Sequence, residues 1–383
     1  MIYSDKFGYY SADTIKTYSK LEAIEKSINA QWHFNDQTYS DIDWTIIPPF
    51  DLWDIYKLRA KQIREQYDYI VLWYSGGCDS HNVLSAFIDS QCEIDEVATY
   101  WDYPTTKEKN SYINAEIFHV VLPHIKKLKQ SGHNFKFRLI DLYKLDVDLI
   151  RAQKPNLDYM VNYFYSISAI GRNLLRERVK DWMDLINSGK KVAFVWGKEK
   201  PRVQYDNLTK KFYFQFFDHI DDCVSPYIQY NHNKGFYDEF FYWSPDCPLI
   251  PVIQSHIIKK FIETCDDKSF YSQFSGLLTP INPKLNMPLD IKTLKSLIYP
   301  KWSNNTFNVG KATFFIPNNP ISDYFTFTNR DKKFLNDNTE EKTEYLKFMN
   351  SYLQKFKNKE FYTNKTGTFL NMKTLYSKRY YLS

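Results

Sequence analysis

Six consecutive residues combine the side chains and the backbone freedom that phosphate chemistry requires: Ser75, Gly76, Gly77, Cys78, Asp79 and Ser80. Two adjacent glycines let the backbone turn tightly and approach a ligand closely. The serine hydroxyls can donate hydrogen bonds to phosphate oxygens, and Asp79 and Ser80 suit the first turn of a helix. A glycine turn that opens a helix directs backbone N–H groups and the positive end of the helix dipole at one point. The stretch therefore predicts a phosphate-binding site.

The residues on either side of this stretch predict the elements that hold it. Residues 70–74 form a short apolar and aromatic run, typical of a strand buried on both faces. Residues 81–90 place Val83, Leu84 and Phe87 at helical spacing. The expected order is strand, glycine turn and helix.

The six residues lack the Gly-Lys-Ser/Thr ending of a Walker A loop and the G-x-G-x-x-G spacing of a dinucleotide-binding fold. They resemble the SGGxDS loop of the PP-loop family, the N-type ATP pyrophosphatases or adenine nucleotide alpha-hydrolase-like proteins, and match all five defining positions. The resemblance implies a HUP-like fold, with ATP as cofactor. In that family the loop holds the β,γ-pyrophosphate, and the substrate attacks the α-phosphate and becomes adenylated. The resemblance covers roughly residues 67–205 and is specific at residues 75–80 only.

Two side chains within the loop have more than one possible role. Asp79 is unexpected beside a polyphosphate because like charges repel, and a Mg²⁺ ion that bridges the carboxylate and the phosphates would resolve this. Asp79 could instead only cap the helix. Cys78 occupies the variable position of the motif, where a helix N-terminus can lower a thiol pKa and make it a nucleophile or sulfur carrier. More often, a cysteine at such a position is a small side chain that fits between loop and sheet.

Positive charges follow the expected strand at residues 191–196, at the edge where parallel sheets bind ligands. They are contributed by Lys198, Lys200 and Arg202. Lys198 and Arg202 are therefore candidate catalytic residues beside Asp79, because positive charge there would stabilise the leaving pyrophosphate. A solvated turn would have the same composition.

Three further residues are candidates for contact with the nucleotide. The resemblance implies, by position after the second strand, that Tyr100 and Asp102 hold the adenine and the ribose. Arg172 is a candidate from the helical crossover that precedes the fourth strand.

Short strands alternate with long helical patterns from residue 69 onward, which indicates right-handed crossovers and an α/β fold with a doubly wound parallel sheet of about five strands. The expected strands are residues 70–74, 93–100, 135–142 and 191–196, with an exposed strand or hairpin arm at residues 211–217. The expected helices are residues 14–30, 53–66, 81–90, 107–130, 162–187, 250–264 and 340–358.

A chain of 383 residues is long enough for more than one domain. We expect an N-terminal helical segment at residues 1–66, a PP-loop ATP-binding domain at 67–205, and a mixed α/β region at 206–383 that recognises the acceptor. Residues 241–246, Phe-Tyr-Trp-Ser-Pro-Asp, resemble a feature of a phage-type branch of the family.

Composition restricts the compartment and the partners. The five cysteines form no C-x-x-C pair, so zinc ribbons and thioredoxin-type motifs lack support, and we expect a reducing, cytoplasmic location. No stretch has the apolar length of a membrane span. The net charge of +5 permits contact with nucleic acid without requiring it. Aromatic residues make up 18% of the chain, which suits either base stacking or a packed core whose composition reflects an AT-rich coding genome.

Two functions remain open from the sequence. The first is an enzyme that adenylates a carboxylate, amide or base carbonyl, releases AMP and pyrophosphate, and transfers nitrogen or sulfur to it. The alternative is a non-catalytic ATP-binding module in a larger assembly. Ile2 occupies the position where a built-in glutaminase needs cysteine, which excludes that nitrogen source. The acceptor is a small molecule or a nucleic acid, and the sequence indicates no oligomeric state.

Overall fold

The computed structural model describes the central part of the chain most fully. The described residues are 5–18, 20–27, 29–101, 116–142, 148, 175–176, 178–198, 201, 203–218, 235–264, 291–302, 340, 343, 362–363, 371–372 and 375–383.

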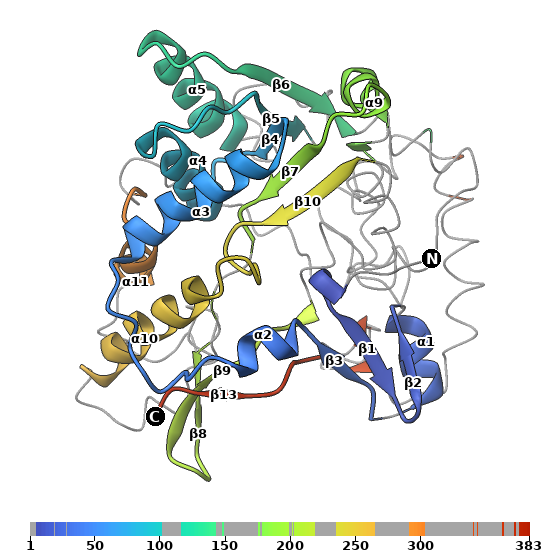
Figure 1. Ribbon diagram of the computed structural model, residues 1–383, viewed down its shortest axis with the longest axis vertical. Helices are drawn as coiled ribbons and strands as arrows, with labels where there is room; N and C mark the ends of the chain where they lie inside the picture. The colour runs from blue at the N-terminus through green and yellow to red at the C-terminus, as the bar shows by residue number, and fades with distance from the viewer. Residues whose placement is uncertain are drawn as a thin grey trace.

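A five-stranded sheet forms the centre of the molecule, and all of its strands are parallel. Its strands are β4 (Tyr69–Trp73), β5 (Glu96–Trp101), β6 (Lys136–Asp141), β7 (Val192–Trp196) and β10 (Phe236–Phe240), in the spatial order β10-β7-β4-β5-β6 (Figure 1). Within this sheet β4 is the first strand in sequence and lies in the middle. The next two strands, β5 and β6, extend the sheet to one edge, and β7 and β10 then extend it on the other side of β4. The strand order therefore reverses between β4 and β7, which is where open α/β sheets bind ligands.

Helices cover both faces of this sheet (Figure 1). They are α3 (Leu52–Gln66), α4 (Cys78–Asp89), the π-helical turn η3 (Ile117–Val121), α5 (Leu122–Gln130) and α9 (Lys180–Asn187). On one face Trp182 of α9 packs edge-on against Trp73, with ring centroids 5.7 Å apart. On the other face the Arg59 side chain of α3 reaches Glu239 of β10. The expected α/β class with a doubly wound parallel sheet is confirmed.

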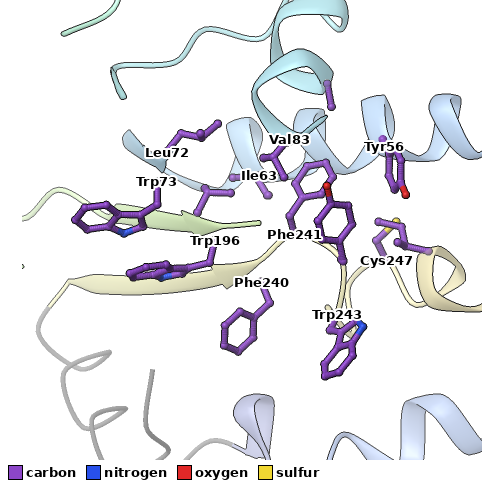
Figure 2. Close-up of a cluster of buried hydrophobic side chains, with 14 of the residues drawn as sticks. Tyr56, Ile63, Leu72, Trp73, Val83, Trp196, Phe240, Phe241, Trp243 and Cys247 are labelled. Carbon is purple, nitrogen blue, oxygen red and sulfur yellow. The ribbon is translucent and has the colours of Figure 1, made fainter. Parts of the chain in front are cut away.

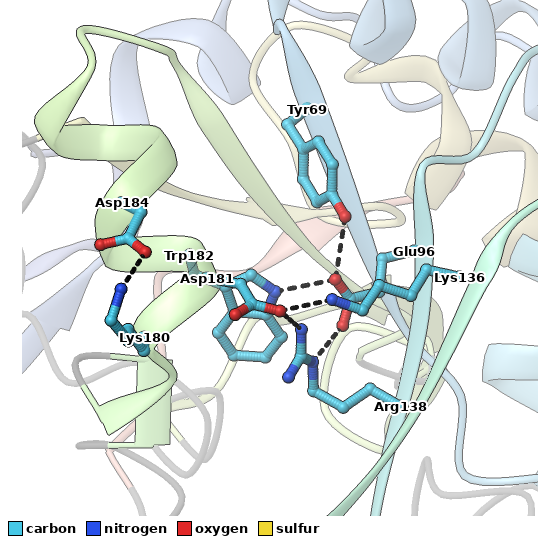
Figure 3. A network of polar contacts seen from close by, with 8 residues as sticks. All are labelled: Tyr69, Glu96, Lys136, Arg138, Lys180, Asp181, Trp182 and Asp184. Atoms are coloured by element: carbon cyan, nitrogen blue, oxygen red, sulfur yellow. Dashed lines mark hydrogen bonds and ion pairs between the residues drawn. The ribbon is translucent and has the colours of Figure 1, made fainter.

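Polar side chains fasten α9 to the amino ends of the strands (Figure 3). Glu96, the first residue of β5, is buried and accepts hydrogen bonds from the Tyr69 hydroxyl at 2.9 Å and the Trp182 indole at 3.0 Å. Arg138 bonds to both Glu96 and Asp181, and so links β6 to the first turn of α9. This network occupies the edge of the sheet opposite to the glycine loop.

The N-terminal region folds into a small antiparallel sheet rather than a long helix. It contains η1 (Asp5–Phe7), β1 (Tyr9–Ala12), β2 (Ile15–Thr17), α1 (Lys20–Lys26), β3 (Gln31–His33) and α2 (Asp36–Ser40), with the strand order β2-β1-β3. The expected N-terminal helical segment is wrong in this part, because the helix expected at residues 14–30 is present only as α1 (Lys20–Lys26), and residues 15–17 form the strand β2. Asp13 adopts a left-handed conformation with φ of 51°, so the chain reverses and pairs Ile15 with Ala12. The β-branched Ile15 and Thr17 suit that strand.

The remaining described elements lie beyond residue 202. They are β8 (Val203–Asp206), β9 (Lys211–Phe214), α10 (Leu249–Glu263), α11 (Ile291–Ile298), β11 (Tyr362–Thr363), β12 (Asn371–Met372) and β13 (Tyr380–Tyr381). β8, β9 and β13 form an antiparallel sheet, so the end of the chain pairs with the arm expected at residues 211–217. The expected helix at residues 250–264 is confirmed as α10. β10 belongs to the central sheet although it lies beyond the boundary expected at residue 205.

Two other expected helices differ from the structure. Val179 has φ of −90° and ψ of 107°, which is extended backbone, so the helix expected at residues 162–187 is interrupted before α9 begins. The helix expected at residues 107–130 is present from residue 116, with a π-helical turn at Ile117–Val121. Its first part, and most of the helix expected at residues 340–358, lie outside the described residues.

Aromatic side chains join these parts into a common core (Figure 2). Trp73 and Trp196 stack across β4 and β7 with ring centroids 4.9 Å apart. Phe7 packs edge-on against Phe240 at 5.1 Å, and so connects the N-terminal segment to β10. Many aromatic residues of this chain are thus accounted for by packing.

Candidate functional site

The glycine loop lies at the carboxyl end of β4, as the sequence predicts. Gly76 has φ of 79°, a left-handed conformation that favours glycine. A Cβ atom at Gly76 would lie 3.1–3.2 Å from side-chain atoms of Val120 and Val121, so the loop is packed closely against η3. Gly77 is the N-cap of α4 in extended conformation, and the helix begins at Cys78. The first-turn N–H groups of α4 therefore point toward the loop, and such a helix N-terminus is a favourable place for an anion.

Hydrogen bonds within the loop hold both of its serines in place. Ser80 is buried, and its Oγ accepts from the Ser75 N–H at 3.1 Å and donates to the Gly77 carbonyl at 3.2 Å. Ser80 therefore holds the loop in shape. Ser75 is exposed, and its Oγ shares a hydrogen bond of 3.1 Å with Ser80 Oγ and accepts the Gly77 N–H at 3.3 Å. Asp79 is half-buried, and its Oδ1 atom is buried. Cys78 is buried, with Sγ 3.7 Å from Asp79 Oδ2.

Gly197 directly follows β7, and its backbone lies so close to the start of α4 that a side chain at this position would crowd the helix. A Cβ atom there would lie 3.0 Å from both N and Cα of Ser80 and 3.1 Å from the carbonyl carbon of Asp79. These are backbone atoms of a helix, so they cannot move aside cheaply. The switch point between β4 and β7 is thus closed around the N-terminus of α4.

Buried tyrosines support the same helix end from the other side. The Tyr242 hydroxyl donates to the Asp79 carbonyl at 2.7 Å and accepts from Asn82 Nδ2 at 3.3 Å. The Tyr299 ring packs on Tyr242 with centroids 5.7 Å apart, and so brings the segment after α11 against the site. Burial raises the pKa of both phenols well above the usual value, so they stay neutral donors.

A neutral histidine pair lies next to the loop. The Tyr74 hydroxyl and His81 Nδ1 share a hydrogen bond of 3.1 Å, and the His81 and His124 rings lie 4.6 Å apart. Burial, reinforced by His124, lowers the pKa of His81 to about 3. The two histidines therefore contribute no positive charge beside the loop.

The other expected site residues fall into two groups. Leu72 pairs with Val195 and Trp73 pairs with Ala98, so the strand register brings Lys198 and Tyr100 to the level where the loop begins. Lys198 and Tyr100 are half-buried there. Asp102, Arg172 and Arg202 lie outside the described residues.

The sequence placed the segment that begins at Gly197 on the ligand-binding edge but indicated no role for Gly197 itself, and it did not place Tyr242 in the site. The signal for Gly197 was its position directly after an apolar strand in a chain with only 11 glycines. Tyr242 lies in the stretch at residues 241–246 that resembles a phage-type feature, but that pattern indicated no role for one tyrosine among 31, and its contact with α4 arises only from the position of β10.

The described residues contain no cluster of three or more histidine, cysteine, aspartate or glutamate side chains that could hold a metal ion. Within the same residues, no helix combines the length and the apolar character that crossing a membrane requires. The described cysteines Cys78, Cys92 and Cys247 are free thiols.

No protein-family model matches this chain, and no curated protein matches it. Among solved structures, it is similar to an NH3-dependent NAD synthetase from Campylobacter jejuni subsp. jejuni in complex with the nitrate ion, with a TM-score of 0.26 and 15% sequence identity. The match covers 39% of this chain and 58% of that one, so this chain spans little more than half the length of the synthetase. A similarity of this extent carries no argument about activity.

Proposed function

We propose that this chain binds ATP at the Ser75–Ser80 loop and uses it to adenylate an acceptor. The observation that carries the proposal is the position of the loop. A glycine turn between a buried strand and a helix N-terminus stands where the strand order reverses, with Gly197 packed against the first turn of α4. Such a place favours a polyphosphate because backbone N–H groups and the helix dipole act together.

We assign different parts of ATP to different residues of the site. The β- and γ-phosphates accept hydrogen bonds from the loop N–H groups and from Ser75, the exposed serine of the loop. Lys198 lies level with the loop, and we assign to it, and to Arg202, the stabilisation of the leaving pyrophosphate. We assign Tyr100, Asp102 and Arg172 to contacts with the nucleoside part of ATP. We assign Cys78 to packing because its side chain is buried.

A Mg²⁺ ion would fit this site if Asp79 and the phosphates of ATP bound it together. The described residues hold no cluster that would bind a metal ion unaided, but Mg²⁺ is usually held by one or two carboxylates together with substrate phosphates. Asp79 is half-buried in the first turn of α4 and supplies such a carboxylate. The ion would offset the repulsion between Asp79 and the phosphates.

The proposed reaction has two steps. An acceptor oxygen attacks the α-phosphorus, the bond to the bridging oxygen breaks, and pyrophosphate leaves. A nitrogen or sulfur nucleophile then attacks the adenylated carbon and expels AMP. We place recognition of the acceptor in residues 206–383, and the free thiols fit a reducing, cytoplasmic location.

The test is the identity of the nucleotide product. The full chain is incubated with ATP, Mg²⁺ and one acceptor class at a time: tRNA, single-stranded DNA, nucleosides, or amino acids with ammonia. The proposal predicts AMP and pyrophosphate in equal amounts with one class. ADP would contradict it. ATP binding without AMP from any class would favour a binding module instead of an enzyme.

A further inference from the structure

A second group of reactive side chains lies on the outer face of the N-terminal sheet. Burial alternates along β1, so Tyr10 and Ala12 face the core while Tyr9 and Ser11 are half-buried. In β3 Trp32 faces inward and His33 faces outward. The outward side chains of β1 and β3 therefore share a face that solvent reaches.

Three of these outward groups form a chain of hydrogen bonds. Ser11 Oγ lies 2.8 Å from His33 Nε2, and His33 Nδ1 lies 2.7 Å from Asp36 Oδ2. A nucleophile, a base and a carboxylate that orients the base are joined in this order in hydrolases that use a serine nucleophile.

The surrounding structure fixes each member of the group. Asn35 is left-handed, with φ of 48° and ψ of 42°, and this turn directs Asp36 back toward His33. The other Asp36 carboxylate oxygen accepts the Phe34 N–H at 3.3 Å. The Tyr9 ring stacks on the His33 ring with centroids 4.7 Å apart and planes 11° apart. The histidine is therefore held in position from two sides.

The charges around the group suit a serine nucleophile. Burial acts to raise the pKa of Asp36, but the hydrogen bond and the charge of His33 outweigh it and hold that pKa below its usual value. The carboxylate thus stays ionised. Lys16 of β2 is paired with Ser11, and its ammonium group lies 4.0 Å from the centroid of the Tyr9 ring on the same face.

We propose that Ser11, His33 and Asp36 form a second reactive centre, which hydrolyses small acyl esters through an acyl-serine intermediate. Ser11 Oγ attacks the ester carbonyl carbon, His33 takes the hydroxyl proton, and the bond to the alcohol oxygen breaks as His33 returns that proton to the leaving group. Water then attacks the acyl-serine, again deprotonated by His33, and releases the acid and the free serine. The centre is built on a different sheet from the glycine loop and needs no ATP.

The test uses the full chain without ATP. A fluorophosphonate–biotin reagent labels activated serines as fluoride leaves, and peptide mass mapping gives the rate at each serine. Ser11 is expected to react at least about 100-fold faster than Ser188, which is exposed and whose hydroxyl donates to the Leu185 carbonyl at 2.6 Å. Hydrolysis of p-nitrophenyl acetate is expected to be lost in Ser11→Ala and unchanged in Ser188→Ala.

Two variants separate a reactive centre from a structural contact between strands. His33→Gln and Asp36→Asn are each expected to slow labelling of Ser11 by at least about 10-fold while circular dichroism shows a folded chain. Labelling of Ser11 no faster than that of Ser188 in the wild type would overturn the proposal, whether or not the variants fold. So would an unchanged rate in Asp36→Asn.

Discussion

The loop at residues 75–80 is made from one continuous stretch of chain, whereas the Ser11 group draws its members from β1, β3 and α2. Backbone N–H groups and a helix N-terminus dominate the loop, and side-chain hydrogen bonds dominate the Ser11 group. The loop lies at the ligand-binding edge of a buried parallel sheet, while the Ser11 group lies on the open face of a small antiparallel one. A site of the first kind is visible in sequence; a site of the second kind depends on strand register.

A buried carboxylate, Glu239, links the central sheet to the N-terminal segment. Its removal is expected to have the largest effect on the free energy of unfolding. Glu239 of β10 is fully buried, contacts Arg59 at 2.6 Å and binds Lys6 from the N-terminal segment. Glu239→Gln removes the carboxylate that lies 2.6 Å from the buried Arg59 and leaves only the partly exposed Asp246, at 3.6 Å, to offset its charge, which costs about 3 kcal/mol. Chemical denaturation measures this loss.

The matched control is Glu263→Gln, because Glu263 forms an ion pair with Lys259 and is 45% exposed. Its loss is expected to cost less than about 1 kcal/mol. Equal effects of the two substitutions would show that Glu239 does not join the two regions.

The same carboxylate predicts how stability depends on pH. Burial raises the pKa of Glu239, but Lys6 and Arg59 outweigh it and lower that pKa from 4.5 to about 2. Between pH 4.5 and about 2 the unfolded chain binds more protons than the folded chain. The contribution of Glu239 to stability is therefore complete above its unfolded pKa of 4.5 and is lost as the pH falls through about 2. The difference in stability between wild type and Glu239→Gln is therefore expected to shrink as pH falls from 6 toward 3. A difference that grows would contradict the sign of this shift.

Gly197→Val tests how closely the central site is packed. The new side chain would meet the Ser80 backbone at 3.0 Å, so α4 must shift. We expect a loss of about 1–3 kcal/mol in stability and a loss of ATP affinity greater than that loss explains. Titration calorimetry and denaturation measure the two quantities.

Gly132→Ala provides the comparison, because Gly132 has φ of 91° but, apart from its chain neighbours, no atom of the described residues lies within 4 Å of a Cβ placed there. Backbone strain there costs about 1–2 kcal/mol, and ATP affinity is expected to remain. If both variants lose ATP binding, general destabilisation is the cause and Gly197 has no special part in the site.

Tyr242→Phe is expected to have the smallest effect. It removes the hydrogen bond to the Asp79 carbonyl, which contributes about 1 kcal/mol. Tyr299→Phe is its control, since in the described structure the buried Tyr299 hydroxyl has no hydrogen-bond partner. We expect the first variant to lower the melting temperature and the second to leave it unchanged or raise it. The reverse order would show that Tyr242 does not support the helix end.

The sequence predicted the centre of the fold because each signal there was local. β4, the glycine turn and α4 follow one another without interruption, and their apolar patterns match their burial. β10 was missed because Asp238 and Glu239 interrupt its apolar run. Both are buried, since Arg176 and Arg59 pair with them from distant parts of the chain. No local pattern could show those partners.

The same limit explains what was missed around the sites. Ser11, His33 and Asp36 are separated in sequence and meet only through the β1–β3 pairing and the Asn35 turn. Ile15, Leu21 and Ile24 fit a helical stripe, and only the left-handed Asp13 and the pairing with β1 turn the first of them into a strand. Tertiary contacts overrode a weak helical pattern here.

The central claim is that the loop at residues 75–80 binds the phosphates of ATP. The most direct measurement is isothermal titration of the full chain with ATP and Mg²⁺, for the wild type, Gly77→Val, Asp79→Ala and Asp89→Ala. Asp89 lies at the other end of α4 and pairs with Lys301 at 2.6 Å, so its variant controls for changes in the helix. The account predicts binding by the wild type and Asp89→Ala, and its loss in Gly77→Val and Asp79→Ala. Equal affinity in all four proteins would contradict it.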